Sequence, residues 1–161
     1  MSAQAGMTWN AIAVPYEKLP QLRGSEELLL ETLESKDGLD IDKAWDGLRY
    51  LLQAKAGNEA LARQLFLGGQ SIGADLGAGP ARVLMPADVK KLAAMLERET
   101  AAALTARYTP TAMEAAGVYP QGIWEGEGPQ ALAYLLHYYE ALRVYFKQAA
   151  VKGQAVVVII W

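Results

Sequence analysis

The chain has 161 residues and a formal net charge of −3, with a pI of about 5.2. Apolar residues make up 52% of it and charged residues 20%, a balance typical of a folded globular protein and not of a disordered chain. The length favours one domain, and the lack of a basic excess argues against nucleic acid as a partner.

Cysteine is absent, which excludes disulfides, thiolate metal sites and cysteine nucleophiles and agrees with a reducing compartment. The longest apolar run, Ala155 to Trp161, is too short to span a membrane. Residues 1–7 lack the charged start and long apolar core of a signal peptide. We therefore expect a cytoplasmic protein without membrane association, with a flexible N-terminus at 1–7 and a single domain at 8–161.

The N-terminal part of this domain predicts a strand followed by a helix. Trp9 to Val14 is apolar and ends at Pro15, which cannot donate to a sheet ladder. Ser25 then stands where a helix N-cap is wanted, and Gly38 stands where a helix C-terminus favours glycine. This pattern indicates a helix between Ser25 and Gly38.

Residues 39–52, LDIDKAWDGLRYLL, predict a helix capped by Asp40. At helical spacing the segment presents an apolar face and a polar face. The apolar face holds Ile41, Trp45, Leu48 and Leu52, and the polar face holds Asp42, Asp46, Arg49 and Gln53. Trp45 is thus expected to be a packing residue of the core. Asn58 can cap a further short helix after this one.

The segment from Gly68 to Pro80 is rich in glycine and has no helical period, so we expect an irregular loop. It lacks the lysine and hydroxyl residue of a phosphate-binding loop. It also precedes a predicted strand instead of leading from a strand into a helix, as a dinucleotide-binding fingerprint would. A tight structural connection is the favoured interpretation, although a functional role for this loop stays open.

The C-terminal half predicts further helices and two strands. Prolines at the start of three segments suit the first turn of a helix, and the β-branched final run suits a strand covered on both faces. We expect a strand at 82–85, helices from Pro86 to about Ala106, from Pro110 to Gly117 and from Pro129 to about Lys152, and an interior strand at 155–161.

Three passages together resemble the YfbM-like family of bacterial proteins, whose members are labelled as a domain of unknown function. They are LDIDKAWDGLRYLL, GPARVLMPADVKKLAAMLE, and the block from VYPQGIW through ALRVYFKQAAVKGQAVVVII, in that order over more than a hundred residues. The resemblance implies an α+β fold and supplies no activity and no catalytic residues. We expect one α+β domain with several helices around a small mixed sheet that includes the N-terminal and C-terminal strands.

Asp42 and Asp46 lie one helical turn apart in the predicted helix, so their carboxylates could share a cation or a proton. A metal site needs more hard ligands than this pair offers. The favoured interpretation is that Asp42 complements the helix dipole and Asp46 forms an ion pair with Arg49. Arg82 could clamp either aspartate, or bind an anion at the glycine-rich loop.

Other candidate residues carry weaker signals. His137, the sole histidine, is expected to be a hydrogen-bonded structural residue of the last helix. Tyr119 and Trp124 flank an aromatic turn that could line a binding cleft or cover the sheet.

Two functional hypotheses follow. The preferred one is a small non-enzymatic domain that binds a protein or small-molecule partner, because no catalytic constellation is complete. The alternative is an enzyme or small-molecule-binding protein with a cleft formed by Asp42, Asp46, Arg82, Tyr119 and Trp124. We assign no catalytic residue, cofactor or metal ligand, and the oligomeric state is left open.

Overall fold

A five-stranded sheet organises the protein in the computed structural model, which describes residues 6–161. The strand order is β2-β1-β5-β4-β3, and every pair is antiparallel. The expected α+β fold is confirmed, and the sheet is antiparallel throughout where a mixed one was predicted. The strands are β1 (Trp9–Val14), β2 (Leu39–Asp40), β3 (Gln70–Asp75), β4 (Pro80–Leu84) and β5 (Ala155–Ile160).

The final strand occupies the centre of the sheet, between β1 and β4. It pairs with β1 along its whole length, from Trp9 opposite Ile160 to Val14 opposite Ala155. Its first five residues, Ala155 to Ile159, are all buried. The predicted interior strand is therefore confirmed, and its unbroken β-branched run reflects the presence of a core on each face of the sheet.

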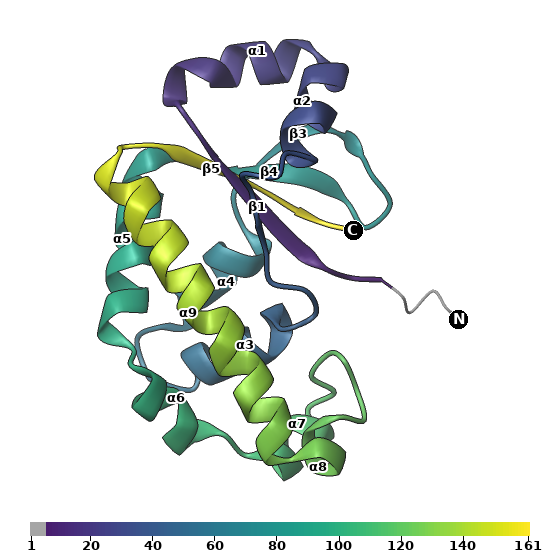
Figure 1. The fold of residues 1–161 in the computed structure, drawn as a ribbon, viewed down its shortest axis with the longest axis vertical. Helices are drawn as coiled ribbons and strands as arrows, with labels where there is room; N and C mark the ends of the chain where they lie inside the picture. Colours follow the sequence, from purple (N-terminus) through teal and green to yellow (C-terminus); the bar gives the residue numbers. More distant parts are fainter. Residues whose placement is uncertain (1–5) are drawn as a thin grey trace.

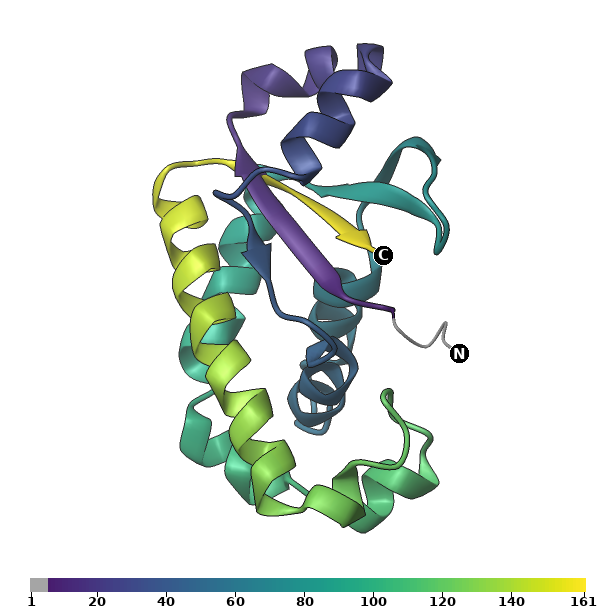
Figure 2. The ribbon, with the colours of Figure 1, turned by 45° about the vertical axis from the view of Figure 1, so that its right-hand side comes forward.

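Two layers of helices make these two cores (Figures 1 and 2). A 3-10 turn (Tyr16–Lys18), α1 (Leu19–Gly24) and α2 (Glu26–Leu33) cover one face, where Leu22 and Leu29 pack with Val157. The Ser25 side chain caps α2 by accepting a hydrogen bond from the backbone N–H of Leu28 at 3.1 Å, as its position predicts.

The other face carries the larger layer (Figures 1 and 2). Its long helix, α9 (Pro129–Val151), packs on α5 (Pro86–Arg98). The core of this layer brings together residues from β1, β5 and most of the helices. The helices of this layer are α3 (Trp45–Gln53), α4 (Glu59–Leu67), α5 (Pro86–Arg98), α6 (Ala101–Arg107), α7 (Pro110–Ala115), α8 (Trp124–Glu127) and α9 (Pro129–Val151).

The segment from residue 39 to 52 departs from its predicted structure at its start. Asp40 belongs to β2 and does not cap a helix; its carboxylate accepts a hydrogen bond from the backbone N–H of Asp42 at 2.7 Å. Asp42 has a φ of 54°, a left-handed conformation that aspartate tolerates, and α3 begins only at Trp45. The apolar face is as expected, because Ile41, Trp45 and Leu48 are all buried.

The predicted irregular loop at 68–80 is wrong for most of its length, because β3 and β4 form a hairpin there. Gly73, with a φ of 75°, lies in β3 where a Cβ would be 2.6 Å from the Leu29 side chain. The register shifts between Ile72 and Asp75, which marks an irregularity in the ladder. Glycine here permits a strand to pass closely beneath α2, so its abundance does not signal an unstructured loop.

The predicted flexible segment at 1–7 falls mainly outside the described residues. Met7 is described, and its backbone N–H donates to the Tyr119 hydroxyl at 3.2 Å while its carbonyl accepts from the Trp45 indole N–H at 2.8 Å. Across residues 6–161, none of the helices is both long enough and apolar enough to cross a bilayer.

Candidate binding groove

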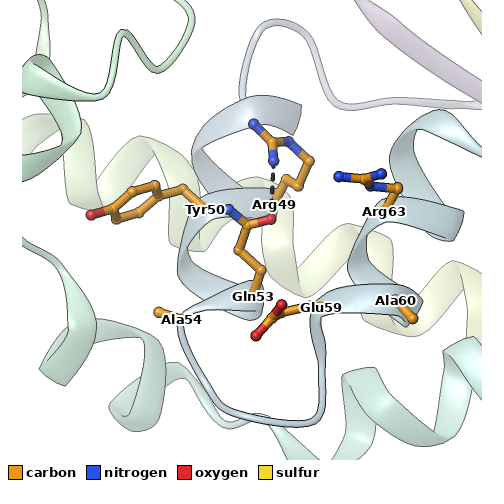
Figure 3. Close-up of a pocket in the computed structure, with 7 residues that line it drawn as sticks. All are labelled: Arg49, Tyr50, Gln53, Ala54, Glu59, Ala60 and Arg63. Carbon is orange, nitrogen blue, oxygen red and sulfur yellow. Dashed lines mark hydrogen bonds between the residues drawn. The ribbon is translucent and has the colours of Figure 1, made fainter.

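A groove of about 730 Å³ runs between α3 and α4 (Figure 3). Both helices are amphipathic and turn their apolar sides to the core, with Leu48 and Leu52 on α3 and Leu65 and Phe66 on α4. Their outward sides therefore form the walls. The groove is lined by Arg49, Tyr50, Gln53, Ala54, Glu59, Ala60 and Arg63.

Arg49 is held in place by its neighbours on α3. Its Nε and NH2 lie 2.8 and 2.7 Å from Oδ1 of Asp46, and its NH1 donates to Oε1 of Gln53 at 3.0 Å. The Asp46 to Arg49 ion pair predicted from the sequence is thus confirmed. A guanidinium has five N–H donors, so these three contacts leave donors of both terminal nitrogens available to a ligand.

Arg63 reaches from α4 toward Arg49 on the opposite wall (Figure 3). It is exposed, and among residues 6–161 no hydrogen bond or ion pair engages its guanidinium. Two guanidiniums near one another repel, although Asp46 partly offsets the charge of Arg49, and an anion between them would offset the repulsion further. A carboxylate or phosphate suits such a place because its oxygens match the fork of N–H donors.

The far end of the groove has a different character. Glu59, the first residue of α4, places its carboxylate there beside Gln53 (Figure 3). Tyr50, Ala54 and Ala60 complete the lining, and the Tyr50 ring points away from the two arginines (Figure 3). The groove therefore offers cationic donors at one end and an anionic acceptor at the other.

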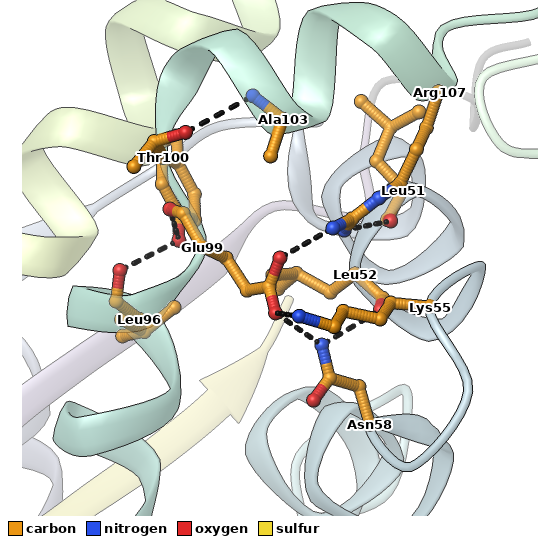
Figure 4. A network of polar contacts seen from close by, with 10 residues as sticks. Leu51, Leu52, Lys55, Asn58, Leu96, Glu99, Thr100, Ala103 and Arg107 are labelled. Atoms are coloured by element: carbon orange, nitrogen blue, oxygen red, sulfur yellow. Dashed lines mark hydrogen bonds and ion pairs between the residues drawn. The ribbon is translucent and has the colours of Figure 1, made fainter.

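Behind this groove, a buried carboxylate fixes the connection between α3 and α4 (Figure 4). Glu99 is 1% exposed. Its Oε2 accepts from Nδ2 of Asn58 at 3.0 Å and lies 3.5 Å from Nζ of Lys55, while its Oε1 lies 2.5 Å from NH2 of Arg107. Asn58 precedes α4 and uses its side chain for these contacts, not as the predicted helix cap.

The same residues also close the C-terminus of α3. Asn58 donates to the Leu52 carbonyl at 3.2 Å, and Arg107 donates to the Leu51 carbonyl at 3.1 Å. The chain leaves the helix at Glu99, so α5 and α6 replace the single helix predicted from Pro86 to about Ala106. A polar cluster from three elements thus sets the relative position of the two groove helices.

Burial of the Glu99 carboxyl favours its neutral form, but its hydrogen bonds from Asn58 and Arg107 and the charges of Arg107 and Lys55 favour the carboxylate. Their combined effect outweighs burial and lowers the pKa of Glu99. The carboxylate is therefore charged at neutral pH, and acidification removes its contribution to the fold.

Three of the residues singled out in the sequence, Asp46, Tyr119 and Asp42, make contacts between different elements of the fold. Oδ2 of Asp46 accepts from the backbone N–H of Tyr119 at 2.8 Å, and the Tyr119 ring packs on Trp45 with centroids 5.8 Å apart. Asp42 accepts from the Tyr134 hydroxyl at 2.7 Å. Burial, followed by this hydrogen bond, raises the pKa of Tyr134. The aspartates therefore form internal contacts with neighbouring elements.

Arg82 does not join them, and its predicted contact with Asp42 or Asp46 is wrong. Its guanidinium donates to the carbonyls of Phe66 and Gly68, at 2.9 and 2.5 Å. Burial lowers the pKa of Arg82 to about 10, which still leaves it protonated at neutral pH. Arg82 ties the end of α4 to the sheet, because the orphan carbonyls of a helix C-terminus are acceptors.

Trp124 and His137 also differ from expectation. The Trp124 side chain is fully buried, and its indole N–H donates to the Val118 carbonyl at 2.9 Å, so this tryptophan is a core residue and does not line a surface cleft. His137 is exposed on α9 with its ring against that of Tyr138, at 4.9 Å between centroids. Among the described residues no hydrogen bond engages its ring, so the predicted hydrogen-bonded structural role is wrong.

Arg63 and Glu59 were missed as site residues by the sequence analysis. The pairs Arg49 with Gln53 and Glu59 with Arg63 each have i, i+4 spacing, which places each pair on one helix face. Nothing in that spacing says that the two faces meet across a groove. Within residues 6–161, no group of three or more histidine, cysteine, aspartate or glutamate side chains is placed to hold a metal ion.

The family model described as Domain of unknown function (DUF1877) matches residues 6–159. The chain belongs to this family. The predicted membership of a YfbM-like domain of unknown function is confirmed.

A solved structure of the family's fold is similar over nearly the whole chain. It is the protein of unknown function YfbM from Escherichia coli, with 23% sequence identity and a TM-score of 0.72, and the alignment covers 96% of this chain and 99% of that one. At this identity the likeness shows a shared fold. No curated protein matches the chain. The family is defined without an activity, so function must be argued from the site.

Proposed function

We propose that this protein is a non-enzymatic binding domain whose α3–α4 groove receives an anionic group of a partner. The observation that carries the proposal is the approach of Arg63 to Arg49 across the groove (Figure 3). Arg49 is already fixed by Asp46 and Gln53, so it loses little side-chain freedom when a ligand binds. A cytoplasmic location, expected from the composition, is part of the same proposal.

The contacts of the predicted acidic residues support binding over catalysis. Asp46 is occupied by Arg49 and Tyr119, and Asp42 is occupied by Tyr134. A general base must reach a substrate proton within hydrogen-bond distance, and both carboxylates instead stabilise neighbouring elements. In this proposal Asp46 is a positioning residue that presents Arg49 to the ligand.

The test is a titration of the isotope-labelled protein with sodium succinate, at constant ionic strength, followed by amide chemical shifts. We expect saturable shifts confined to residues 49–63. The Arg63→Gln variant should weaken binding about threefold or more, since one exposed ion pair contributes roughly 0.2–1 kcal/mol and two oxygens are engaged here. Arg98→Gln removes an exposed arginine on α5 outside the groove and serves as the matched control.

The outcome that contradicts the proposal is equal weakening by Arg98→Gln and Arg63→Gln, because succinate would then be responding to net charge alone. Shifts that scatter over the surface without saturation would lead to the same conclusion.

A further inference from the structure

The α3–α4 groove is bipolar, and this narrows the chemistry of its ligand. Arg49 and Arg63 form the cationic end, and the Glu59 carboxylate forms the anionic end (Figure 3). Glu59 is exposed, and within the described part of the chain no cation pairs with it. A ligand with negative charge alone would meet attraction at one end and repulsion at the other.

Glu59 and Arg63 have the i, i+4 spacing at which they could pair with one another on α4. They do not, because the guanidinium extends across the groove toward Arg49 while the carboxylate lies beside Gln53 (Figure 3). The two charged side chains are thus attached to α4 one turn apart. At 1.5 Å per residue their backbone positions are about 6 Å apart along the helix axis.

An extended peptide has a similar spacing between the backbone positions of side chains on one side. Residues i and i+2 of a strand point to the same side and lie about 6.6 Å apart. An acidic side chain at one position and a basic side chain two residues away would thus reach opposite ends of the groove. A free α-amino acid carries both charges on one carbon, which is too close to span a helical turn. The groove volume of about 730 Å³ is also ample for several residues.

We infer that the α3–α4 groove binds an extended peptide segment that carries an acidic and a basic side chain two positions apart. The acidic side chain meets Arg49 and Arg63, and the basic side chain meets Glu59. This inference rests on the proposed anion-binding function of the same groove and adds the charge pattern of its partner.

The experiment compares three five-residue peptides, acetylated and amidated so that their termini carry no charge. Each has alanine at positions one, three and five. Positions two and four are Glu and Lys in the first peptide, Glu and Gln in the second, and Glu and Glu in the third. Amide shifts of the full chain give the dissociation constant of each, and free alanine, with both charges on one carbon, is titrated alongside.

We expect the Glu/Lys peptide to bind about threefold more tightly than the Glu/Gln peptide, the contribution of one exposed ion pair. The Glu/Glu peptide should bind most weakly. Glu59→Gln should abolish the preference for lysine, and Arg63→Gln should weaken the Glu/Lys and Glu/Gln peptides alike. The matched control is Glu26→Gln, which removes an exposed glutamate from the first position of a different helix, α2.

Three results would overturn the inference. The first is equal affinity for the Glu/Lys and Glu/Gln peptides, the second is a preference for Glu/Glu, and the third is binding of free alanine as tight as that of any peptide. In each case, weaker succinate binding by the Arg63→Gln variant would still support the anion-binding proposal. If neither succinate nor the peptides perturb residues 49–63, both proposals fall together.

Discussion

Asp46 fixes Arg49 at the wall of the α3–α4 groove, with its Oδ1 2.7 Å from NH2 and 2.8 Å from Nε of the guanidinium. The other carboxylate oxygen of this 8% exposed aspartate accepts from the backbone N–H of Tyr119. One side chain therefore joins a groove-lining arginine to the segment before α8, more than seventy residues later in the chain. Loss of this carboxylate should affect both stability and ligand binding.

We expect Asp46→Ala to lower the free energy of unfolding by about 1.5–3 kcal/mol, the contribution of hydrogen bonds to a charged group in a mostly buried place. Urea denaturation measures this loss, and the succinate affinity of the folded variant should also fall. Asp37→Ala removes an exposed aspartate and should change stability by no more than about 0.5 kcal/mol. If Asp46→Ala lowers the free energy of unfolding no more than Asp37→Ala does, the contacts of the Asp46 carboxylate do not stabilise the fold.

Gly47 permits the close approach of α3 to two other elements. A Cβ at this position would be 2.7 Å from the Trp124 ring and 2.8 Å from a methyl of Leu135. Overpacking typically costs about 1–3 kcal/mol, and alanine regains up to about 1 kcal/mol of helix propensity. We therefore expect Gly47→Ala to destabilise the fold by about 1–2 kcal/mol, as measured by denaturant titration.

The matched control for this substitution is Gly24→Ala at the end of α1, where an added Cβ would have no neighbour within 4 Å. It should be neutral or stabilise by up to about 1 kcal/mol, since alanine restricts the unfolded chain. Stabilisation by Gly47→Ala of the same size would mean that Trp124 and Leu135 can move aside without cost.

Glu99 gives a prediction for the dependence of stability on pH. Because its pKa is lowered in the folded protein, its stabilising contribution is complete above the unfolded value of about 4.3 and declines as pH falls through the folded pKa. Glu99→Gln should therefore be less stable than the parent by about 1–3 kcal/mol at pH 7. The difference should stay constant down to about pH 5 and shrink below about pH 4.

Urea titrations of both proteins at pH 7, 5, 4 and 3 would measure this difference. Glu31→Gln, on the exposed side of α2, is the control for the loss of a negative charge. If the loss of stability caused by Glu99→Gln grows on acidification, the result would contradict a lowered pKa of Glu99.

Several predictions that rested on local sequence patterns were correct. The unbroken apolar run at 155–161 indicated an interior strand, and β5 lies at the centre of the sheet. Trp45 was expected in the core and is 7% exposed. The Ser25 cap and the Asp46 to Arg49 pair depend on residues three positions apart, so backbone geometry alone brings them together.

Helix and strand boundaries were less accurate where tertiary contacts outweigh local preference. The glycines at 68–80 predicted a loop, but β3 forms there because β4 pairs with it. Gly73 also lets α2 pack close to this strand. The helix predicted from Asp40 starts at Trp45 because Leu39 and Asp40 pair with β1. Sheet pairing and close packing depend on contacts between distant segments, which the sequence of one segment does not specify.

By itself, then, the sequence determined the α+β class, the family and the apolar faces of the main elements, because burial of those faces drives folding in any arrangement. The tertiary structure decided which polar side chains meet. Arg82 finds carbonyls at the end of α4 and not an aspartate, and Arg63 faces Arg49 from another helix (Figure 3). Such meetings depend on how helices are placed against one another, which the spacing within one helix does not specify.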